Sequence, residues 1–205
     1  MKVAVFLDYA NVNAASLNLN CSVDYGELLN YLADEEEDRF LAVAYAYVPI
    51  DPRQEHAMDS KIDELWQQGY IVKSKVGAIA GESYKCDFDV EMTMDICRVV
   101  YESSPDVVVL VSGDKDFIPV VLEMRGKCVR VEVAAFDSAM ARELALKSNG
   151  YINLDVWVNG CEEIIDEEDL EEESFEHVST DDENIRDEEQ EESNSEEREH
   201  GDSNS

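Results

Sequence analysis

Short apolar runs alternate with amphipathic segments over residues 1–155 of the chain. The runs are rich in valine, alanine and aromatic residues, which is typical of buried strands. The segments between them carry apolar residues three or four positions apart, which indicates helices. The pattern predicts strands at residues 3–7, 40–48, 70–76, 107–111, 128–133 and 151–154. It predicts helices at residues 25–33, 54–68, 90–101, 117–124 and 139–146.

The boundaries of these elements follow from proline and glycine. Pro49 is expected to stop the second strand, because proline cannot donate a backbone hydrogen bond to a neighbouring strand. Gly69 and Gly126 are expected to end the helices that precede them. The glycine-flanked stretch G-A-I-A-G at residues 77–81 is expected to form a loop.

Strands that are apolar throughout are usually buried on both faces, as in a parallel sheet covered by helices. Because crossovers between parallel strands are right-handed, this order of elements predicts a three-layer α/β/α sandwich of the Rossmann-like kind, with a mostly parallel central sheet. Ligands of such sheets bind at the carboxyl ends of the strands. The residues that follow each strand are therefore the first candidates for function.

Polar side chains follow two of the predicted strands. The first strand leads into Asp8, with Asn11 close behind, and the strand at 107–111 leads into S-G-D-K-D, which contains Asp114 and Asp116. A third acidic group lies in K-C-D-F-D-V-E-M-T-M-D, where a helix is predicted to begin, and it comprises Asp87, Asp89 and Asp95.

Two explanations of these carboxylates are open. Any one aspartate at the start of a helix is typical of an N-cap, and Pro119 lies where a helix capped near Asp116 would tolerate proline. The spacing of Asp87, Glu91 and Asp95 also fits a solvated helix stripe. However, several carboxylates at one sheet edge repel each other, and a hard cation such as Mg²⁺ or Mn²⁺ relieves that repulsion. Capping and metal binding are compatible for Asp116.

Charge divides the chain into two parts. Residues 1–160 hold 27 acidic and 14 basic side chains, whereas residues 161–205 hold 22 acidic and 2 basic ones. The second part has few apolar residues to offset its ordering entropy, so we expect a folded domain at 1–160 and a disordered acidic tail at 161–205. The tail is expected to contact a protein partner, or to cover a basic patch of the domain as an RNA mimic.

Other classes of protein lack their sequence signals. The five cysteines include no C-x-x-C pair, which argues against a disulfide framework or a zinc site. No G-x-G-x-x-G, P-loop or G-x-S-x-G motif is present, and the three histidines do not gather in one element. The first apolar run is too short for a signal peptide or a membrane span. We therefore expect a cytoplasmic protein that does not contact membranes.

Three motifs, in this order, resemble the NYN domain family, in the LabA-like branch of the PIN-like nuclease superfamily. They are V-F-L-D-Y-A-N-V, K-C-D-F-D-V-E-M-T-M-D and V-L-V-S-G-D-K-D-F-I-P-V-V, and the resemblance spans residues 2–154. It implies a PIN-like fold and a metal-dependent ribonuclease that uses Mg²⁺ or Mn²⁺. The catalytic residues and metal ligands that it implies are Asp8, Asp89, Asp114 and Asp116, with Asp95 as a further metal ligand.

The resemblance also suggests substrate contacts. Asn11 would bind a phosphate, a ribose or the attacking water, unless it serves only as a turn residue. Lys85 and Lys115, each beside a motif aspartate, would contact the RNA backbone, unless they are surface lysines without a role. Cys86 departs from the glycine that the family often has there. Helical spacing places Asp95 about 240° around the helix from Asp89, so we expect Asp89 to be the closer ligand.

The net charge of −13 over residues 1–160 opposes RNA binding, which normally requires a basic surface. Two other functions therefore remain open beside the ribonuclease. One is a non-catalytic regulatory or adaptor module of the same fold that binds RNA or protein, and the other is a different metal-dependent phosphoryl-transfer enzyme. The sequence also leaves the oligomeric state open, a homodimer included.

Overall fold

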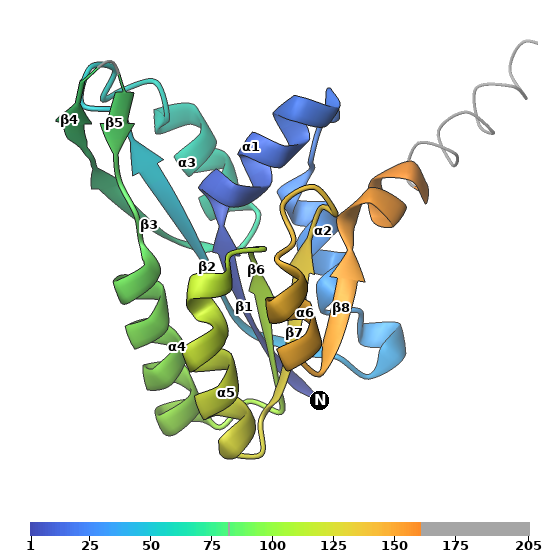
Figure 1. Ribbon diagram of the computed structural model, residues 1–205. Helices are drawn as coiled ribbons and strands as arrows, with labels where there is room; N and C mark the ends of the chain where they lie inside the picture. The colour runs from blue at the N-terminus through green and yellow to red at the C-terminus, as the bar shows by residue number, and fades with distance from the viewer. Residues whose placement is uncertain (82, 161–205) are drawn as a thin grey trace, which may run out of the picture. The chain divides into compact units, whose positions relative to one another are not determined.

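A six-stranded parallel sheet forms the centre of the protein in the computed structural model, which describes residues 1–81 and 83–160 (Figure 1). Its strands are ordered β3-β2-β1-β6-β7-β8, and every neighbouring pair is parallel. The strands are β1 (Lys2–Asp8), β2 (Phe40–Ile50), β3 (Ile71–Val76), β6 (Val107–Val111), β7 (Arg130–Ala135) and β8 (Gly150–Asn153). The predicted parallel sheet is confirmed.

Helices cover both faces of the sheet. One core packs against α1 (Tyr9–Leu19), α2 (Tyr25–Leu32), α3 (Asp59–Gln67) and the helical residues 154–160. The other core packs against α4 (Asp89–Ser103), α5 (Ile118–Gly126) and α6 (Arg142–Lys147). Within β1, Val5 belongs to the first core and Phe6 to the second, because successive side chains of a strand point to opposite faces. The three-layer α/β/α sandwich is therefore confirmed.

A small hairpin replaces the loop predicted at residues 77–81. Strand β4 (Ala78–Ala80) pairs antiparallel with β5 (Ser83–Lys85) beyond the end of β3. A Cβ atom on Gly77 would lie 2.6 Å from Cδ2 of Tyr84, so only glycine lets the two strands of the hairpin approach this closely. The hairpin rises above the carboxyl edge of the sheet (Figure 1).

Other element boundaries also differ from the predictions: β7 begins at Arg130 rather than at residue 128, and α6 begins at Arg142 rather than at residue 139. Strand β2 does not stop at Pro49 but continues to Ile50. Pro49 lies beyond the last pair between β1 and β2, Asp8 with Tyr47, and β2 there has a neighbour only on its β3 side, a setting in which proline is tolerated. Helix α3 begins at Asp59 rather than at residue 54.

Helix α1 was not predicted at all. Its sequence, Y-A-N-V-N-A-A-S-L-N-L, intersperses asparagines with small apolar residues, so its hydrophobic face is weak. The face that it buries consists of Tyr9, Val12, Ala15 and Ser16.

Two short 3₁₀ helices complete the described elements, η1 (Glu35–Glu37) and η2 (Lys115–Phe117).

The tail predicted at residues 161–205 lies outside the described residues, so its disorder and the domain boundary at residue 160 stay predictions. Among the described helices, none combines the length and the apolar character that a bilayer crossing requires.

Candidate metal and active site

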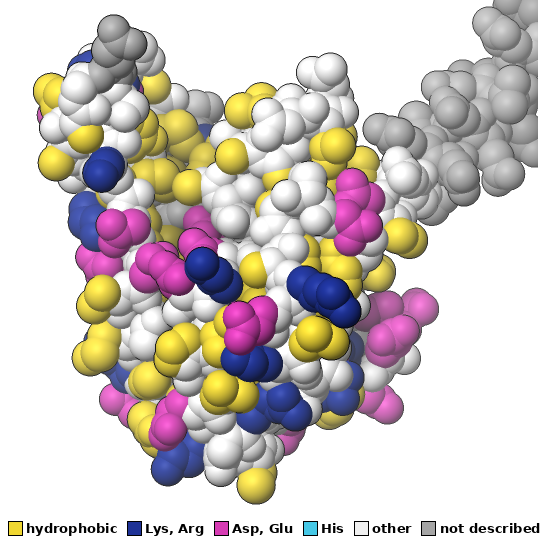
Figure 2. All heavy atoms as spheres, in the orientation of Figure 1, with side chains coloured by type: hydrophobic (Ala, Val, Ile, Leu, Met, Phe, Trp, Pro, Cys, Tyr) yellow, Lys and Arg dark blue, Asp and Glu magenta, His cyan; other side chains and the backbone are white. Residues whose placement is uncertain are grey.

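The order of the strands reverses between β1 and β6. The chain runs from β1 outward through β2 to β3 on one side, and from β6 outward through β7 to β8 on the other. Connections that diverge from two adjacent strands leave a crevice at their carboxyl ends, where ligands of such sheets bind. Asp8 ends β1 and Asp114 lies three residues beyond β6. Figure 2 shows this edge hollowed between the β4–β5 hairpin and α1, with acidic side chains at the base of the hollow.

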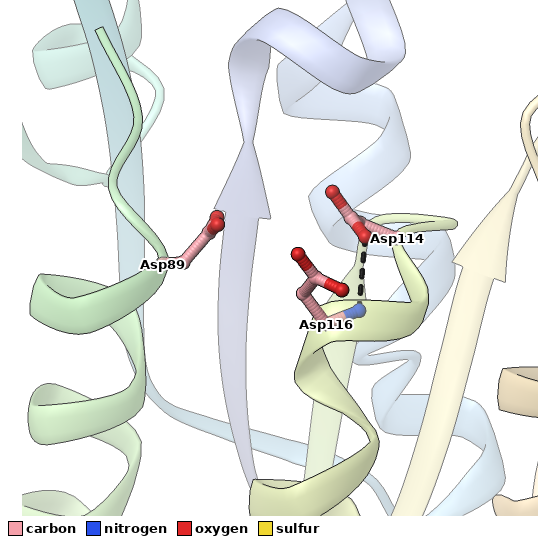
Figure 3. A group of neighbouring side chains, drawn as sticks. All are labelled: Asp89, Asp114 and Asp116. Atoms are coloured by element: carbon pink, nitrogen blue, oxygen red, sulfur yellow. Dashed lines mark hydrogen bonds between the residues drawn. The ribbon is translucent and has the colours of Figure 1, made fainter.

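Three carboxylates meet at this edge of the sheet. One oxygen each of Asp89, Asp114 and Asp116 lies within 4.8 Å of the others, and we call these residues the carboxylate group. Asp89 begins α4, while Asp116 lies in η2 and Asp114 precedes it. The three side chains point toward a common space (Figure 3). Asp89 and Asp114 are half-buried and Asp116 is exposed, so the space is open to ligands from solvent.

Asp114 is also a helix cap. Its Oδ1 accepts a hydrogen bond from the backbone N–H of Asp116 at 2.9 Å (Figure 3). The cap lies two residues before the predicted position near Asp116. Pro119 lies in the first turn of α5, directly after η2, where proline is tolerated. The cap fixes the position of the Asp114 carboxylate while its second oxygen stays free of hydrogen bonds within the described residues.

Asp8 lies beside the carboxylate group but not within it. Its Oδ1 accepts a hydrogen bond from the N–H of Asn11 at 3.2 Å and so caps α1, while its Oδ2 accepts one from Oγ of Ser112 at 3.1 Å. Burial raises the pKa of Asp8 and repulsion from Asp114 adds to the rise, whereas these hydrogen bonds act against it. Asp8 lies close enough to the group to contribute to the raised pKa of Asp89, after burial, Asp114 and Asp87.

Repulsion within the site also acts on Asp89. Burial raises the pKa of the Asp89 carboxyl first, and repulsion from Asp114, then from Asp87, raises it further. A divalent cation bound between the carboxylates would remove this repulsion, and carboxylate oxygens are the ligands that hard cations prefer. The carboxylate group is therefore suited to a divalent metal ion.

The turn between β6 and η2 is built from residues that the sequence analysis passed over. Ser112 is fully buried, and its Oγ bonds both to Asp8 and to the N–H of Asp114, the latter at 3.3 Å. A Cβ atom on Gly113 would lie 2.1 Å from the carbonyl oxygen of Ala139, so this position requires glycine. The sequence did contain a signal for Ser112 and Gly113: in S-G-D, two small residues separate a buried strand from Asp114, which indicates a tightly packed turn.

Asn11 has a structural contact that the sequence did not suggest. Its Oδ1 accepts a hydrogen bond from the N–H of Gly113 at 3.1 Å, which ties the first turn of α1 to the turn after β6. Its Nδ2 group has no hydrogen-bond partner among the described residues. The residue therefore positions the turn and keeps a donor for the substrate contact predicted for it.

The structure does not bring Asp95 into the carboxylate group. Asp95 is only 2% exposed, and it accepts hydrogen bonds from the hydroxyl of Tyr47 at 2.8 Å, from Lys73 at 2.5 Å and from Arg98 at 2.8 Å. It lies six residues beyond Asp89 along α4 and hence on a different helix face. Its oxygens join α4 to β2 and β3, and the metal ligation that the family resemblance implied for Asp95 stays a prediction.

The two lysines predicted to contact the substrate are both exposed. Lys115 lies in η2 between the two aspartates of the D-K-D motif, and Lys85 ends β5 of the hairpin. Neither forms a salt bridge within the described part of the chain. Both ammonium groups are therefore available to an anionic ligand at the edge that holds the carboxylates.

Comparisons with known proteins agree with this geometry. The model of the NYN domain family matches residues 2–155. Over 161 residues, the chain is 30% identical to the low amplitude and bright protein LabA of Synechococcus elongatus, and the match covers 75% of this chain and 83% of LabA. A crystal structure of a protein of unknown function from Vibrio parahaemolyticus superposes with a TM-score of 0.61 at 25% identity, covering 74% of this chain and 91% of the other.

The family match includes all three motifs and every member of the carboxylate group, and the likeness to LabA indicates the branch. The chain therefore belongs to the NYN domain family of PIN-like proteins, in its LabA-like branch.

Proposed function

We propose that the protein is a metal-dependent ribonuclease that hydrolyses RNA phosphodiester bonds with Mg²⁺ or Mn²⁺. The observation that carries the proposal is the convergence of Asp89, Asp114 and Asp116 to within 4.8 Å at the switch point of the sheet. Membership of a PIN-like family supports it, because a carboxylate site at this position is what that resemblance implied.

Each residue of the site has a part in the proposed reaction. Asp89, Asp114 and Asp116 would hold the cation, and the cap formed by Asp114 keeps two of these carboxylates in register. A bound divalent ion supplies Lewis acidity to the phosphodiester and lowers the pKa of a bound water. Asn11 would donate from Nδ2 to the substrate or to that water, and Lys85 and Lys115 would contact backbone phosphates.

A non-catalytic regulatory or adaptor module of the same fold is the second candidate. The net charge of −13 over residues 1–160 favours it, because nucleic acid is repelled by an acidic surface. The intact carboxylate group favours the ribonuclease, because a module that only binds RNA or protein does not need clustered, mutually repelling carboxylates. The acidic residues 161–205 would then serve as the contact to a protein partner, and the cytoplasmic location stays part of the proposal.

The test is cleavage of single-stranded and structured RNA by the full chain with Mn²⁺ or Mg²⁺, followed by EDTA. Asp114→Asn is the decisive variant, because asparagine caps a helix as well as aspartate does and only the charge is lost. We expect EDTA to abolish cleavage and Asp114→Asn to reduce its rate by about 100-fold or more, as removal of a transition-state contact does.

Asp63→Asn is the matched control, since Asp63 is an exposed aspartate on α3 outside the carboxylate group. It should cleave as the unchanged chain does. Cleavage without metal, or cleavage that survives Asp114→Asn, would disprove the proposed site, whereas RNA binding with no cleavage under any of these conditions would favour the adaptor.

A further inference from the structure

We infer that bound single-stranded RNA extends from the carboxylate group over one surface of the helical layer, and that the RNA phosphates contact this surface. We call this surface the α5–α6 cationic face, and it comprises Lys115, Arg125, Lys127, Arg142 and Lys147. The inference rests on the proposed function and adds to it the path of the substrate.

The charge of this face is opposite to that of the domain. Four of its cations lie in η2, α5 and α6, which also hold Asp116, Glu123 and Glu143, and Lys127 follows α5 directly. The local net charge is +2, whereas residues 1–160 carry −13. Figure 2 shows Lys and Arg side chains gathered over α5 and α6, below the acidic side chains of the site. Phosphate contacts with lysine and arginine supply most of the sequence-independent affinity for nucleic acids. An overall acidic charge is therefore compatible with RNA binding along this one surface.

The face is continuous with the active site. The N–H of Ala141 donates a hydrogen bond at 2.9 Å to the carbonyl of Gly113, in the turn that carries Asp114, so Arg142 begins α6 directly beside that turn. Lys115 lies close enough to Glu143 to lower the pKa of that carboxyl, an effect for which the bonded Lys147 is the larger cause.

The face also continues from α6 to the far end of α5. The guanidinium of Arg125 donates to the backbone carbonyl of Lys147, which joins the ends of the two helices. Lys127 follows two residues later at the end of α5. The cations therefore form a row that starts at the D-K-D motif and ends beyond α5.

Most cations of the face are free of carboxylate partners. Of its five cations, only Lys147 forms a salt bridge within the described part of the chain, to Glu143 at 2.6 Å. The other basic strip of the domain, on β3 and α4, differs in this respect. Its Lys73 and Arg98 are both held by the buried Asp95, and Lys75 pairs with Glu91 at 2.6 Å. Phosphates would have to displace carboxylates there, which is why we assign the RNA to the α5–α6 cationic face.

An exposed aromatic ring lies at the far end of the row. Tyr101 of α4 is 56% exposed, and the ammonium of Lys127 lies 5.5 Å from the centre of its ring. The hydroxyl of Tyr101 donates to Glu123 at 2.9 Å, which holds the ring in place. Cationic grooves with aromatic platforms bind single strands, because phosphates pair with the cations and a base stacks on the ring.

The test measures binding of a fluorescent single-stranded RNA oligonucleotide to the full chain by anisotropy at several salt concentrations. All variants carry Asp114→Asn to prevent cleavage. Arg125→Glu with Lys127→Glu reverses two cations far from the carboxylates, and Lys2→Glu with Lys61→Glu makes the same charge change on other surfaces. We expect the first pair to weaken binding at least tenfold and to lower the slope of log K against log salt by about 1.4, or about 0.7 for each lost phosphate contact. The control pair should change affinity less than threefold.

Equal weakening by the two pairs would overturn the inference, because only total charge would then matter. Poly-glutamate is added as a competitor at a charge concentration equal to that of the RNA. Failure of poly-glutamate to displace the RNA supports RNA as the occupant, whereas equal competition would assign the face to acidic polypeptides instead.

Hydrolysis of bis(p-nitrophenyl) phosphate with Mn²⁺ separates the two proposals, since this small diester requires only the carboxylate group. Without the Asp114→Asn background, Arg125→Glu with Lys127→Glu should hydrolyse it at the unchanged rate but should cleave RNA at least tenfold more slowly at low RNA concentration. If the unchanged chain cleaves neither substrate, and the pair of substitutions still weakens RNA binding, the ribonuclease is disproved and the α5–α6 cationic face is retained. If the unchanged chain cleaves both substrates, and the pair of substitutions leaves RNA binding unaffected, the ribonuclease is supported and the α5–α6 cationic face is disproved as the RNA path.

Discussion

Asp89 places an electrostatic cost on the metal-free protein. Burial and then repulsion from Asp114 raise its pKa above the value in the unfolded chain, which is about 3.9 for aspartate. An acid of this kind weakens the fold as the pH rises through its folded pKa, and the cost is absent below its unfolded pKa. Asp89→Asn should therefore raise the Tm of the metal-free protein at pH 7, and the gain should disappear toward pH 3.5.

Thermal unfolding in EDTA at the two pH values checks this prediction, with Asp63→Asn as the exposed control. Added Mn²⁺ should reverse the order, because the unchanged chain gains stability from the bound ion while the variant has lost a ligand. A variant that is less stable than the unchanged chain at pH 7 in EDTA would show that Asp89 is not repelled in the fold.

The sequence predicted the residues of the site better than their contacts. Asp114 and Asp116 were identified from the D-K-D motif after an apolar strand, and Asp89 from the K-C-D-F-D motif before a helix. The turn that carries Asp114 is held in part by two hydrogen bonds, from Ser112 to Asp8 and from Gly113 to Asn11, that join residues more than 100 positions apart. Local sequence carries no signal for such distant pairs, which is why the sequence predicted a turn role or a substrate role for Asn11 but not its contact with Gly113.

At the scale of elements, the turn after β6 couples the carboxylate group to α6. Gly113→Ala should disturb this packing, because its Cβ would lie 2.1 Å from the carbonyl oxygen of Ala139, a backbone atom that cannot move independently. We expect a loss of about 1–3 kcal/mol in unfolding free energy, as for overpacked sites, together with at least tenfold weaker Mn²⁺ binding.

Gly126→Ala is the control for this substitution, since a Cβ on Gly126 at the end of α5 meets nothing within 4 Å. It should leave Mn²⁺ affinity unchanged and alter stability by no more than about 1 kcal/mol. Denaturant unfolding and calorimetric Mn²⁺ titration measure both quantities. Equal effects of the two substitutions would mean that the contact with Ala139 does not constrain the turn.

The elements differed in how far the sequence determined them. The strands β1 and β6 were predicted because unbroken apolar runs are required of a strand buried on both faces. Helix α1 escaped notice because it is tethered by a cap from Asp8 and by packing of small residues, rather than by an obvious hydrophobic stripe. The β4–β5 hairpin has strands of three residues each, too short for a period-two pattern to be recognised.

At the scale of the whole molecule, Asp95 joins three elements from two layers. It lies on α4 and binds Tyr47 of β2 and Lys73 of β3, so Asp95→Asn should destabilise the fold. We expect a loss of about 2 kcal/mol, below the 3–5 kcal/mol of a fully buried pair because Lys73 and Arg98 are partly exposed. Mn²⁺ affinity at temperatures where the variant is folded should change less than twofold.

Denaturant unfolding and Mn²⁺ titration of Asp95→Asn distinguish a structural role from the metal-ligand role implied by the family resemblance. Tyr47→Phe, which removes a single hydrogen bond to the same carboxylate, should cost about 1 kcal/mol and leave metal binding intact. A drop in Mn²⁺ affinity of tenfold or more for Asp95→Asn alone would restore Asp95 as a ligand.

The reversal of strand order at β1 and β6 has a consequence for biosynthesis. Asp8 is made first, whereas Asp89 and Asp114 follow 81 and 106 residues later, so Asp8 and the carboxylate group come together only after β6 has been translated and has paired with β1. Closing a loop of this length costs conformational entropy before the pairing of β1 with β6 contributes its contacts. The candidate site is therefore absent from any nascent chain in which β1 and β6 have not yet paired, and the three carboxylates converge only as the two central strands meet.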